Sequence, residues 1–183
     1  ISAFSEYNST YNIKSSDGNI LNWYNFTSIN SGFYKYFSGA TYWPDMSLDN
    51  GLTIEWKIKV NSLSPGSAGL YLGGRDGVTD WYVYLNAADK VTAPGGLEYA
   101  VDINEWHTYR LTVLGKDAGV SKANFYVDDN LAFSEMTSGS ISDKILWGGV
   151  SWDSAYPDAD YDYIRIDATG AYAPATAVDY TLT

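Results

Sequence analysis

The chain has 183 residues, a mass of 20.2 kDa and a formal net charge of −11 at pH 7, which fits one domain with a short tail. A negative field repels phosphate backbones, so we expect no nucleic-acid partner. No apolar run approaches the length that a membrane span needs, so we expect no membrane insertion. The absence of cysteine and the single histidine exclude disulfides and zinc sites built from thiolates or several histidines.

The aromatic composition is unusual, because 17 Tyr and 7 Trp stand against only 6 Phe. Aromatic residues favour strands, and tyrosine and tryptophan suit a surface that is apolar and wet at once. With few charges and no cysteine, this composition indicates a secreted bacterial β-protein that handles sugars. The alternative is an all-β core that uses many aromatic residues for packing alone.

Residues 52–60 give the clearest strand signal, with five apolar residues at alternate positions and Thr, Glu or Lys between them. A pair of strands is expected around a glycine-rich turn at 73–77, and a hairpin is expected around a turn at 128–130. No window shows a helical period. The segments predicted as strands are 52–60, 68–72, 80–85, 108–114, 123–127, 131–133, 145–152 and 161–166.

This order of elements predicts an all-β fold, a two-sheet antiparallel jelly-roll sandwich. We expect the domain to cover residues 1–167. Residues 168–183 are small and loop-like, and we interpret them as a C-terminal linker or an edge strand. The first ten residues lack a basic start and an apolar run, so we expect that a signal peptide has been removed.

Six short motifs resemble, in this order, the concanavalin A-like lectin/glucanase superfamily in its laminin G-like form. They cover residues 4–6, 21–23, 51–56, 105–111, 124–129 and 162–166. The resemblance implies two curved antiparallel sheets, with a concave face that often holds a saccharide. Its members include carbohydrate-binding modules, glycoside hydrolases and polysaccharide lyases, so the fold alone leaves the function open.

The motifs of the enzymes on this fold are missing. Retaining glycosidases carry an acidic run of the form Glu-x-Asp-x-x-Glu on one strand, because an acid and a nucleophile must flank one bond. Here Glu55 stands alone among Thr and Lys, and no glutamate accompanies Asp160 and Asp162. This pattern disfavours a hydrolase.

A polysaccharide lyase is disfavoured on similar grounds. Residues 36–42 look like the Tyr-Phe-Lys-Ala-Gly-x-Tyr motif of one alginate lyase family, but Ser38 replaces the lysine. The accompanying Gln-x-His and Arg-x-Glu-x-Arg strands are absent. His107 stands in a Trp-His-x-Tyr strand start, where a hydrogen-bonded structural role is favoured over a catalytic base.

Sugar binding requires flat rings against pyranose faces, with planar polar groups at the rim. Tyr82 and Tyr84 alternate with an apolar row, so we expect them on an outer sheet face. Tyr161, Tyr163 and Arg165 are expected to form a second such row. The predicted carbohydrate-binding residues are Trp43, Arg75, Tyr82, Tyr84, Trp152, Tyr156, Tyr161 and Arg165.

Oxygen ligands are the ones that this sequence offers to a metal, and they suit calcium. The resemblance implies a structural calcium ion held by Asp162 and an acidic residue near the N-terminus, for which Glu6 matches. Asp17 is a possible addition to this set. A second candidate site is the cluster of Asp153, Asp158 and Asp160. Solvated turn acids are the alternative interpretation.

We therefore interpret the chain as a non-catalytic carbohydrate-binding module that binds a polysaccharide or oligosaccharide. We expect it to be secreted, and to be joined to other domains of a bacterial enzyme or surface protein. The alternatives are a polysaccharide lyase or glycoside hydrolase on the same fold, and a cell-surface adhesion domain.

Overall fold

The computed structural model describes residues 5–7, 11–16, 20–25, 32–36, 51–63, 69–76, 79–117, 120–139, 143–149, 157–167 and 170–174. Up to residue 36, and for 75–76, 115–117, 120, 139, 143–147 and 149, the description covers the backbone alone. The described residues form strands and their connections, with no helix among them.

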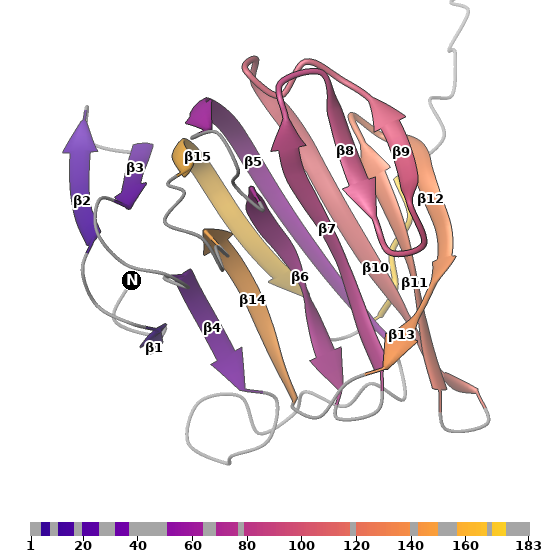
Figure 1. The fold of residues 1–183 in the computed structure, drawn as a ribbon. Coiled ribbons are helices and arrows are strands. Elements are labelled where there is room, and N and C mark those ends of the chain that lie inside the picture. The colour runs from indigo at the N-terminus through magenta and orange to yellow at the C-terminus, as the bar shows by residue number, and fades with distance from the viewer. Residues whose placement is uncertain are drawn as a thin grey trace, which may run out of the picture.

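One sheet has eight strands and faces the viewer in Figure 1. Its order is β1-β4-β14-β6-β7-β8-β9, and β13 pairs with β7 beside this path. All its pairs are antiparallel. The strands are β1 (Ser5–Tyr7), β4 (Gly32–Tyr36), β6 (Leu70–Asp76), β7 (Thr79–Ala87), β8 (Lys90–Ala93), β9 (Leu97–Ala100), β13 (Ser138–Gly139) and β14 (Asp143–Gly149).

The second sheet has seven antiparallel strands in the order β12-β11-β10-β5-β15-β3-β2 and lies behind the first. Its longest strand, β5, pairs with β10 on one side and with β15 on the other. The strands are β2 (Tyr11–Ser16), β3 (Ile20–Asn25), β5 (Leu52–Leu63), β10 (His107–Asp117), β11 (Val120–Val127), β12 (Asn130–Met136) and β15 (Pro157–Asp167).

The core lies between the two sheets and follows the period-two pattern of the sequence. The five apolar residues predicted to share one face of β5 are all fully buried, and Trp81, Val83 and Leu85 of β7 oppose them from the other sheet. A buried hydrogen bond from Trp81 Nε1 to Ser121 Oγ, 3.1 Å long, joins the sheets directly. The described fully buried side chains of largest volume are Trp56, Trp81, Tyr109, Tyr161 and Phe125.

The structure confirms the all-β prediction and has a strand within each predicted range, while residue 68 and residues 150–152 of two of these ranges lie outside the described residues. The predicted hairpin is also confirmed, since Asp128 and Asp129 turn β11 into β12 with positive φ angles of 46° and 66°. The β8–β9 hairpin and the strands β1 to β4 were not assigned from the pattern, because each is short or lacks a clear alternation.

The glycine-rich turn predicted at 73–77 is wrong in its position, because Gly73 to Asp76 continue β6. Gly73 pairs with Tyr82, and a Cβ at this glycine would lie only 2.4 Å from the Trp81 carbonyl oxygen and 2.6 Å from the Tyr82 Cα. Glycine is needed here because the two backbones approach closely, not because the chain turns.

Part of the predicted C-terminal linker contacts the domain. The Thr53 hydroxyl of β5 donates to the Gly170 carbonyl at 2.9 Å and accepts from the Tyr172 backbone N–H at 2.8 Å. Residues 170–172 therefore cross the outer face of the seven-stranded sheet at the start of β5. The division at residue 167 stays a prediction.

Candidate functional site

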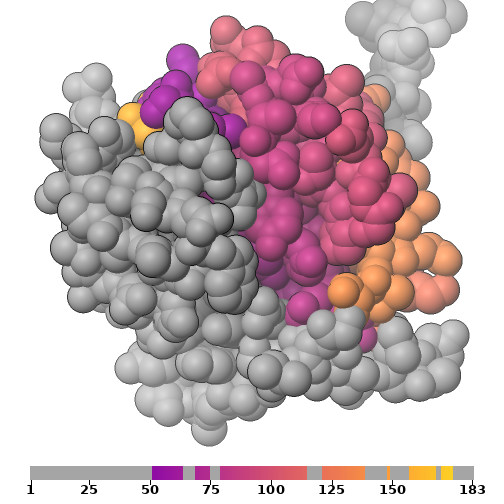
Figure 2. Space-filling view, in the orientation of Figure 1, coloured from indigo at the N-terminus to yellow at the C-terminus, as the bar shows by residue number. Residues whose placement is uncertain are grey.

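Three tyrosines cluster on the outer face of the eight-stranded sheet, and we call Tyr71, Tyr82 and Tyr84 the tyrosine cluster. Tyr71 of β6 is the register partner of Tyr84 on β7, while Tyr82 lies one row further. The predicted orientation of Tyr82 and Tyr84 is confirmed, since both are half-buried while their neighbours Trp81, Val83 and Leu85 are fully buried. Figure 2 shows the surface of β6 and β7, in magenta, at the centre of this face.

The three rings lie in mutual contact at two orientations. Tyr71 and Tyr82 are stacked, with ring centroids 5.2 Å apart and an interplanar angle of 23°. Tyr84 stands across both rings, at 5.6 Å and 73° from Tyr71 and at 5.2 Å and 66° from Tyr82. Because Gly73 has no side chain opposite Tyr82, the Tyr71 ring has space to reach across to it. Such pairs hold one another in place.

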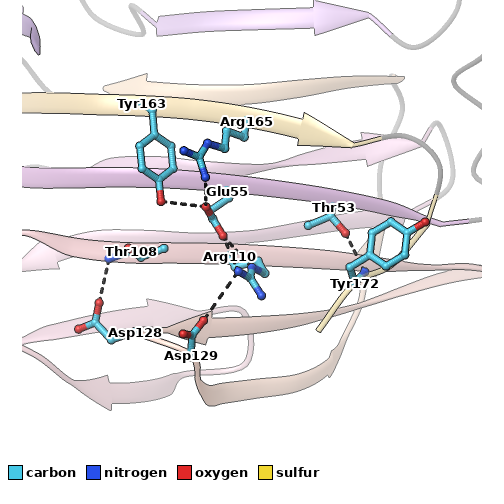
Figure 3. A network of polar contacts seen from close by, with 9 residues as sticks. All are labelled: Thr53, Glu55, Thr108, Arg110, Asp128, Asp129, Tyr163, Arg165 and Tyr172. Atoms are coloured by element: carbon cyan, nitrogen blue, oxygen red, sulfur yellow. Dashed lines mark hydrogen bonds and ion pairs between the residues drawn. The ribbon is translucent and has the colours of Figure 1, made fainter. Parts of the chain in front are cut away.

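A charged network occupies the outer face of the other sheet (Figure 3), and we call Glu55, Arg110, Tyr163 and Arg165 the Glu55 network. Arg110 Nε and Nη2 donate to Glu55 Oε2 at 2.8 and 2.6 Å, and the Tyr163 hydroxyl donates to Oε1 at 2.8 Å. Arg165 lies 3.6 Å from Glu55 Oε1 and stacks over the Tyr163 ring at 4.1 Å. Asp129 lies 3.8 Å from Arg110.

The Glu55 network cross-links β5, β10 and β15 through one carboxylate that contacts two arginines. The Glu55 side chain is 11% exposed and Arg110 is 21% exposed, whereas Arg165 is 69% exposed. Burial and then the Glu55 hydrogen bond raise the pKa of Tyr163 above its ordinary value. The Glu55 carboxylate is therefore engaged by Arg110 and Tyr163, and Arg165 is the group of the network that solvent reaches most.

The predicted sugar-binding residues do not form one site. Tyr82 and Tyr84 lie on the outer face of the eight-stranded sheet, and Arg165 lies on the opposite face of the sandwich. Arg75 lies in β6 and is described by its backbone alone, while Trp43, Trp152 and Tyr156 lie outside the described residues.

The prediction that Tyr161 faces outward with Tyr163 is wrong. Tyr161 pairs with Ile58, and Tyr163 already pairs with Lys57, so a β-bulge between them turns Tyr161 into the core. The Tyr161 side chain is 2% exposed, and burial raises its pKa well above the ordinary value. A ring buried in this way has no face left for a sugar.

Asp162 pairs with a cation on the outer face of the seven-stranded sheet. Lys57 Nζ lies 2.7 Å from Asp162 Oδ2, and this hydrogen bond raises the pKa of the Lys57 ammonium. Glu6 belongs to β1 of the other sheet and is described by its backbone alone. Asp17 and Asp153 lie outside the described residues, and among those described no three acidic or histidine side chains are placed to hold a metal. The calcium site stays a prediction.

His107 is fixed at both of its ring nitrogens. Nδ1 lies 2.5 Å from Asp128 Oδ2 and Nε2 lies 2.8 Å from the Asp102 carbonyl oxygen. The same Asp128 carboxylate accepts the Thr108 backbone N–H at 2.9 Å. These contacts tie the start of β10 to the β11–β12 turn, which is the hydrogen-bonded structural role expected from the sequence.

Two features of these sites were not predicted from the sequence. Tyr71 lies in a predicted strand, and its alternation with Leu70 and Leu72 was a signal that it shares the face of Tyr84. The pairing of Glu55 with Arg110 depends on the register of β5 against β10, for which the sequence carries no direct signal beyond their outward positions.

No known family profile matches the chain, and no curated protein matches its sequence. Solved structures do match. An alginate lyase of polysaccharide lyase family 7, AlgAT5, has a TM-score of 0.58 at 12% identity over 89% of this chain and 84% of that chain. The fold is a jelly-roll sandwich.

Two further similar structures are binding domains. The carbohydrate recognition domain of Emp46p, in its metal-free form, has a TM-score of 0.53 at 13% identity over 93% of this chain and 90% of that one. The binding domain of botulinum neurotoxin DC, in complex with SialylT, has a TM-score of 0.53 at 11% identity over 91% of this chain and 43% of that one. Identities this low show a shared fold alone.

The described part of the chain contains no helix that is long and apolar enough to cross a membrane.

Proposed function

We propose that the chain is a non-catalytic carbohydrate-binding module, and that the tyrosine cluster is its sugar site. The observation that carries this proposal is the placement of Tyr71, Tyr82 and Tyr84, three rings within 5.2–5.6 Å of one another on the outer face of a sheet. The inner positions of β7 already fill the core, so the packing of the core does not require the rings of Tyr82 and Tyr84. Tyr82 and Tyr84 are half-buried and offer a ring face and a hydroxyl to a pyranose. Tyr71 is 2% exposed, so it supports these two rings and does not itself offer a face to the sugar.

The similar structures support this proposal in general terms. They include a carbohydrate recognition domain and alginate lyases on the same fold. A sugar-related function agrees with these neighbours. The choice of binding over catalysis depends on the side chains of this chain, because the described ones include no clear catalytic base at the tyrosine cluster. His107 belongs to the other sheet and has both nitrogens engaged, so it is a poor candidate for a base at the tyrosine cluster.

Binding is tested by retention of the purified chain on a panel of immobilised polysaccharides. We expect at least one polysaccharide to retain the wild type, and Tyr82→Ala and Tyr84→Ala to lose retention without unfolding. Tyr172→Ala is the matched control, because Tyr172 is 51% exposed beside β5 on the opposite face. Equal retention of all three variants and the wild type contradicts the proposed site.

A polysaccharide lyase is the second candidate, favoured by the alginate lyases among the similar structures and by tyrosines that could serve as acid and base. The same panel is followed in solution for unsaturated products at the ultraviolet edge and for new reducing ends. If the wild type shows turnover and Tyr82→Phe or Tyr84→Phe abolishes it, the chain is a lyase and the proposal of a non-catalytic module is wrong.

Secretion, neighbouring domains and a bound metal ion are further parts of the proposed function. We propose that the module is secreted, joined to other domains, and stabilised by a calcium ion at Glu6 and Asp162. Bound calcium stabilises the folded state by ligand linkage, so EDTA should lower the melting temperature and Asp162→Ala should remove that effect. An unchanged melting temperature and no metal by elemental analysis would exclude the ion.

A further inference from the structure

A row of outward side chains continues from the tyrosine cluster to the edge of the eight-stranded sheet, across β7, β8 and β9 (Figure 1). Tyr84 of β7 is the register partner of Thr92 on β8, and Thr92 is the partner of Glu98 on β9. Val91 and Ala93, the neighbours of Thr92, are buried in the core, which directs the threonine outward. Because paired positions of an antiparallel sheet share a face, the three side chains lie on one face.

This row is accessible along its length. Two strand spacings, about 10 Å, separate Tyr84 from Glu98. Thr92 is half-buried, as Tyr82 and Tyr84 are, and the Glu98 side chain is 56% exposed. The β8–β9 turn at 94–96 consists of one alanine and two glycines, and a Cβ at either glycine would meet no atom within 4 Å. A glycan that stacks on the tyrosines therefore has an open path towards β9.

Glu98 ends the row with an acceptor that is only partly engaged. Lys90 Nζ donates to Glu98 Oε1 at 2.7 Å, and this hydrogen bond raises the pKa of the Lys90 ammonium. The Lys90 side chain is 33% exposed, so the glutamate is the more accessible member of the pair. Glu98 Oε2 has no hydrogen-bond partner among the described residues. The cation is thus neutralised, while one carboxylate oxygen faces the ligand side.

The charge of the face supports an uncharged ligand. Among the strand residues of this sheet whose side chains are described, Lys90 and Glu98 are the accessible charged groups on the outer face. Asp80 of β7 shares this face and is 9% exposed. A ligand on the row therefore meets the hydroxyls of Tyr84 and Thr92 and a carboxylate, and the one accessible cation is already paired.

We propose that the glycan bound at the tyrosine cluster runs along this row towards β9 and is uncharged there, with Glu98 accepting hydrogen bonds from its hydroxyl groups. This inference rests on the proposed function and adds the path and the class of the sugar. Hydrogen bonds to a carboxylate are roughly twice as strong as those between neutral groups. A uronate or a sulfated sugar in the same place would lie against the Glu98 carboxylate, in a chain with a net charge of −11, and would be repelled.

The test compares neutral polymers with charged counterparts of the same backbone, by affinity electrophoresis of the purified chain. Hydroxyethyl cellulose is paired with carboxymethyl cellulose, dextran with dextran sulfate, and carboxyl-reduced polygalacturonate with polygalacturonate. The ionic strength is 0.15 M, where charges more than about 8 Å away are largely screened. For at least one pair, we expect the wild type to bind the neutral member at least ten-fold more tightly, equivalent to about 1.4 kcal/mol.

Glu98→Gln keeps the size of the side chain and removes its charge. The variant should bind the neutral member several-fold more weakly and the charged member more tightly, because the repulsion is gone and Lys90 is released. Glu135→Gln is the matched control, since Glu135 lies on β12 of the other sheet and pairs with Lys122 in the same way, at 3.2 Å. It changes the net charge by the same amount and should leave both affinities unchanged. Circular dichroism of both variants should match the wild type.

Equal affinity for both members of each pair, or tighter binding of a charged member, overturns the inference. The proposed function still stands in that case if Tyr82→Ala and Tyr84→Ala lose retention. A neutral preference that Glu98→Gln leaves intact, or that Glu135→Gln reduces equally, also overturns the inference, because the discrimination then does not come from Glu98. A wild type that binds no polysaccharide removes both proposals.

Discussion

Replacement of Glu55 by glutamine tests whether the Glu55 network stabilises the fold. The variant keeps the size of the side chain and removes the charge that accepts two hydrogen bonds from Arg110, at 2.8 and 2.6 Å, and one from Tyr163 at 2.8 Å. Hydrogen bonds to charged groups contribute about 1.5–3 kcal/mol each. Arg110 is 21% exposed and glutamine still accepts one bond, so we expect a net loss of about 2–3 kcal/mol.

Urea denaturation measures this loss as a change in the free energy of unfolding. Calorimetry should show a melting temperature lower by roughly 4–12 °C, since a domain of this size shifts by about 2–4 °C per kcal/mol. Arg165→Gln is the control, because Arg165 is 69% exposed and its ion pair is worth at most about 1 kcal/mol. If Glu55→Gln destabilises the chain no more than this control, the network does not hold the sheet together.

Three further predictions concern two buried tyrosines of the core and the close approach of β6 to β7 at Gly73. Tyr161→Phe should leave the free energy of unfolding at pH 7 unchanged or raise it by up to about 1 kcal/mol, because the buried hydroxyl finds no partner among the described residues; a clear loss in urea denaturation would show that it has one. Burial raises the pKa of Tyr109 and Tyr161 above the ordinary value of 10, so their contribution to stability is complete below about pH 10 and is lost as the pH rises above it. Alkaline melting curves should show this decline, and it should be shallower in Tyr161→Phe. Gly73→Ala should cost about 1–3 kcal/mol, because its Cβ would meet the Trp81 carbonyl oxygen at 2.4 Å; an unchanged melting temperature would argue against the close approach.

The strands of the core could be predicted from the sequence because burial on one face imposes a period of two. Residues 52–60 show this directly, and all five predicted inward residues of β5 are fully buried. The β11–β12 turn was predictable for a similar local reason, since aspartates tolerate the positive φ angles that Asp128 and Asp129 adopt.

The candidate site could be predicted only in part, because its residues meet through register. The sequence placed Tyr161 on the wrong face, because the bulge between Tyr161 and Tyr163 inverts the inward–outward alternation of β15. Tyrosine occurs on buried and exposed faces alike, so the residue type gives no warning of this. Two adjacent glycines are typical of a turn, so the sequence predicted one at 73 and 74. In the structure these glycines pair with Tyr82 and Trp81 of β7.

The central claim is that a glycan binds to the tyrosine cluster, and NMR titration tests it most directly. Backbone amide shifts are followed while an oligosaccharide of the retained polysaccharide is added to the uniformly labelled chain. We expect the largest shifts in β6 and β7, around Tyr71, Tyr82 and Tyr84, with little change in β5 and β10 on the opposite sheet. Largest shifts around Glu55 and Arg110, or none at saturating oligosaccharide, would contradict it.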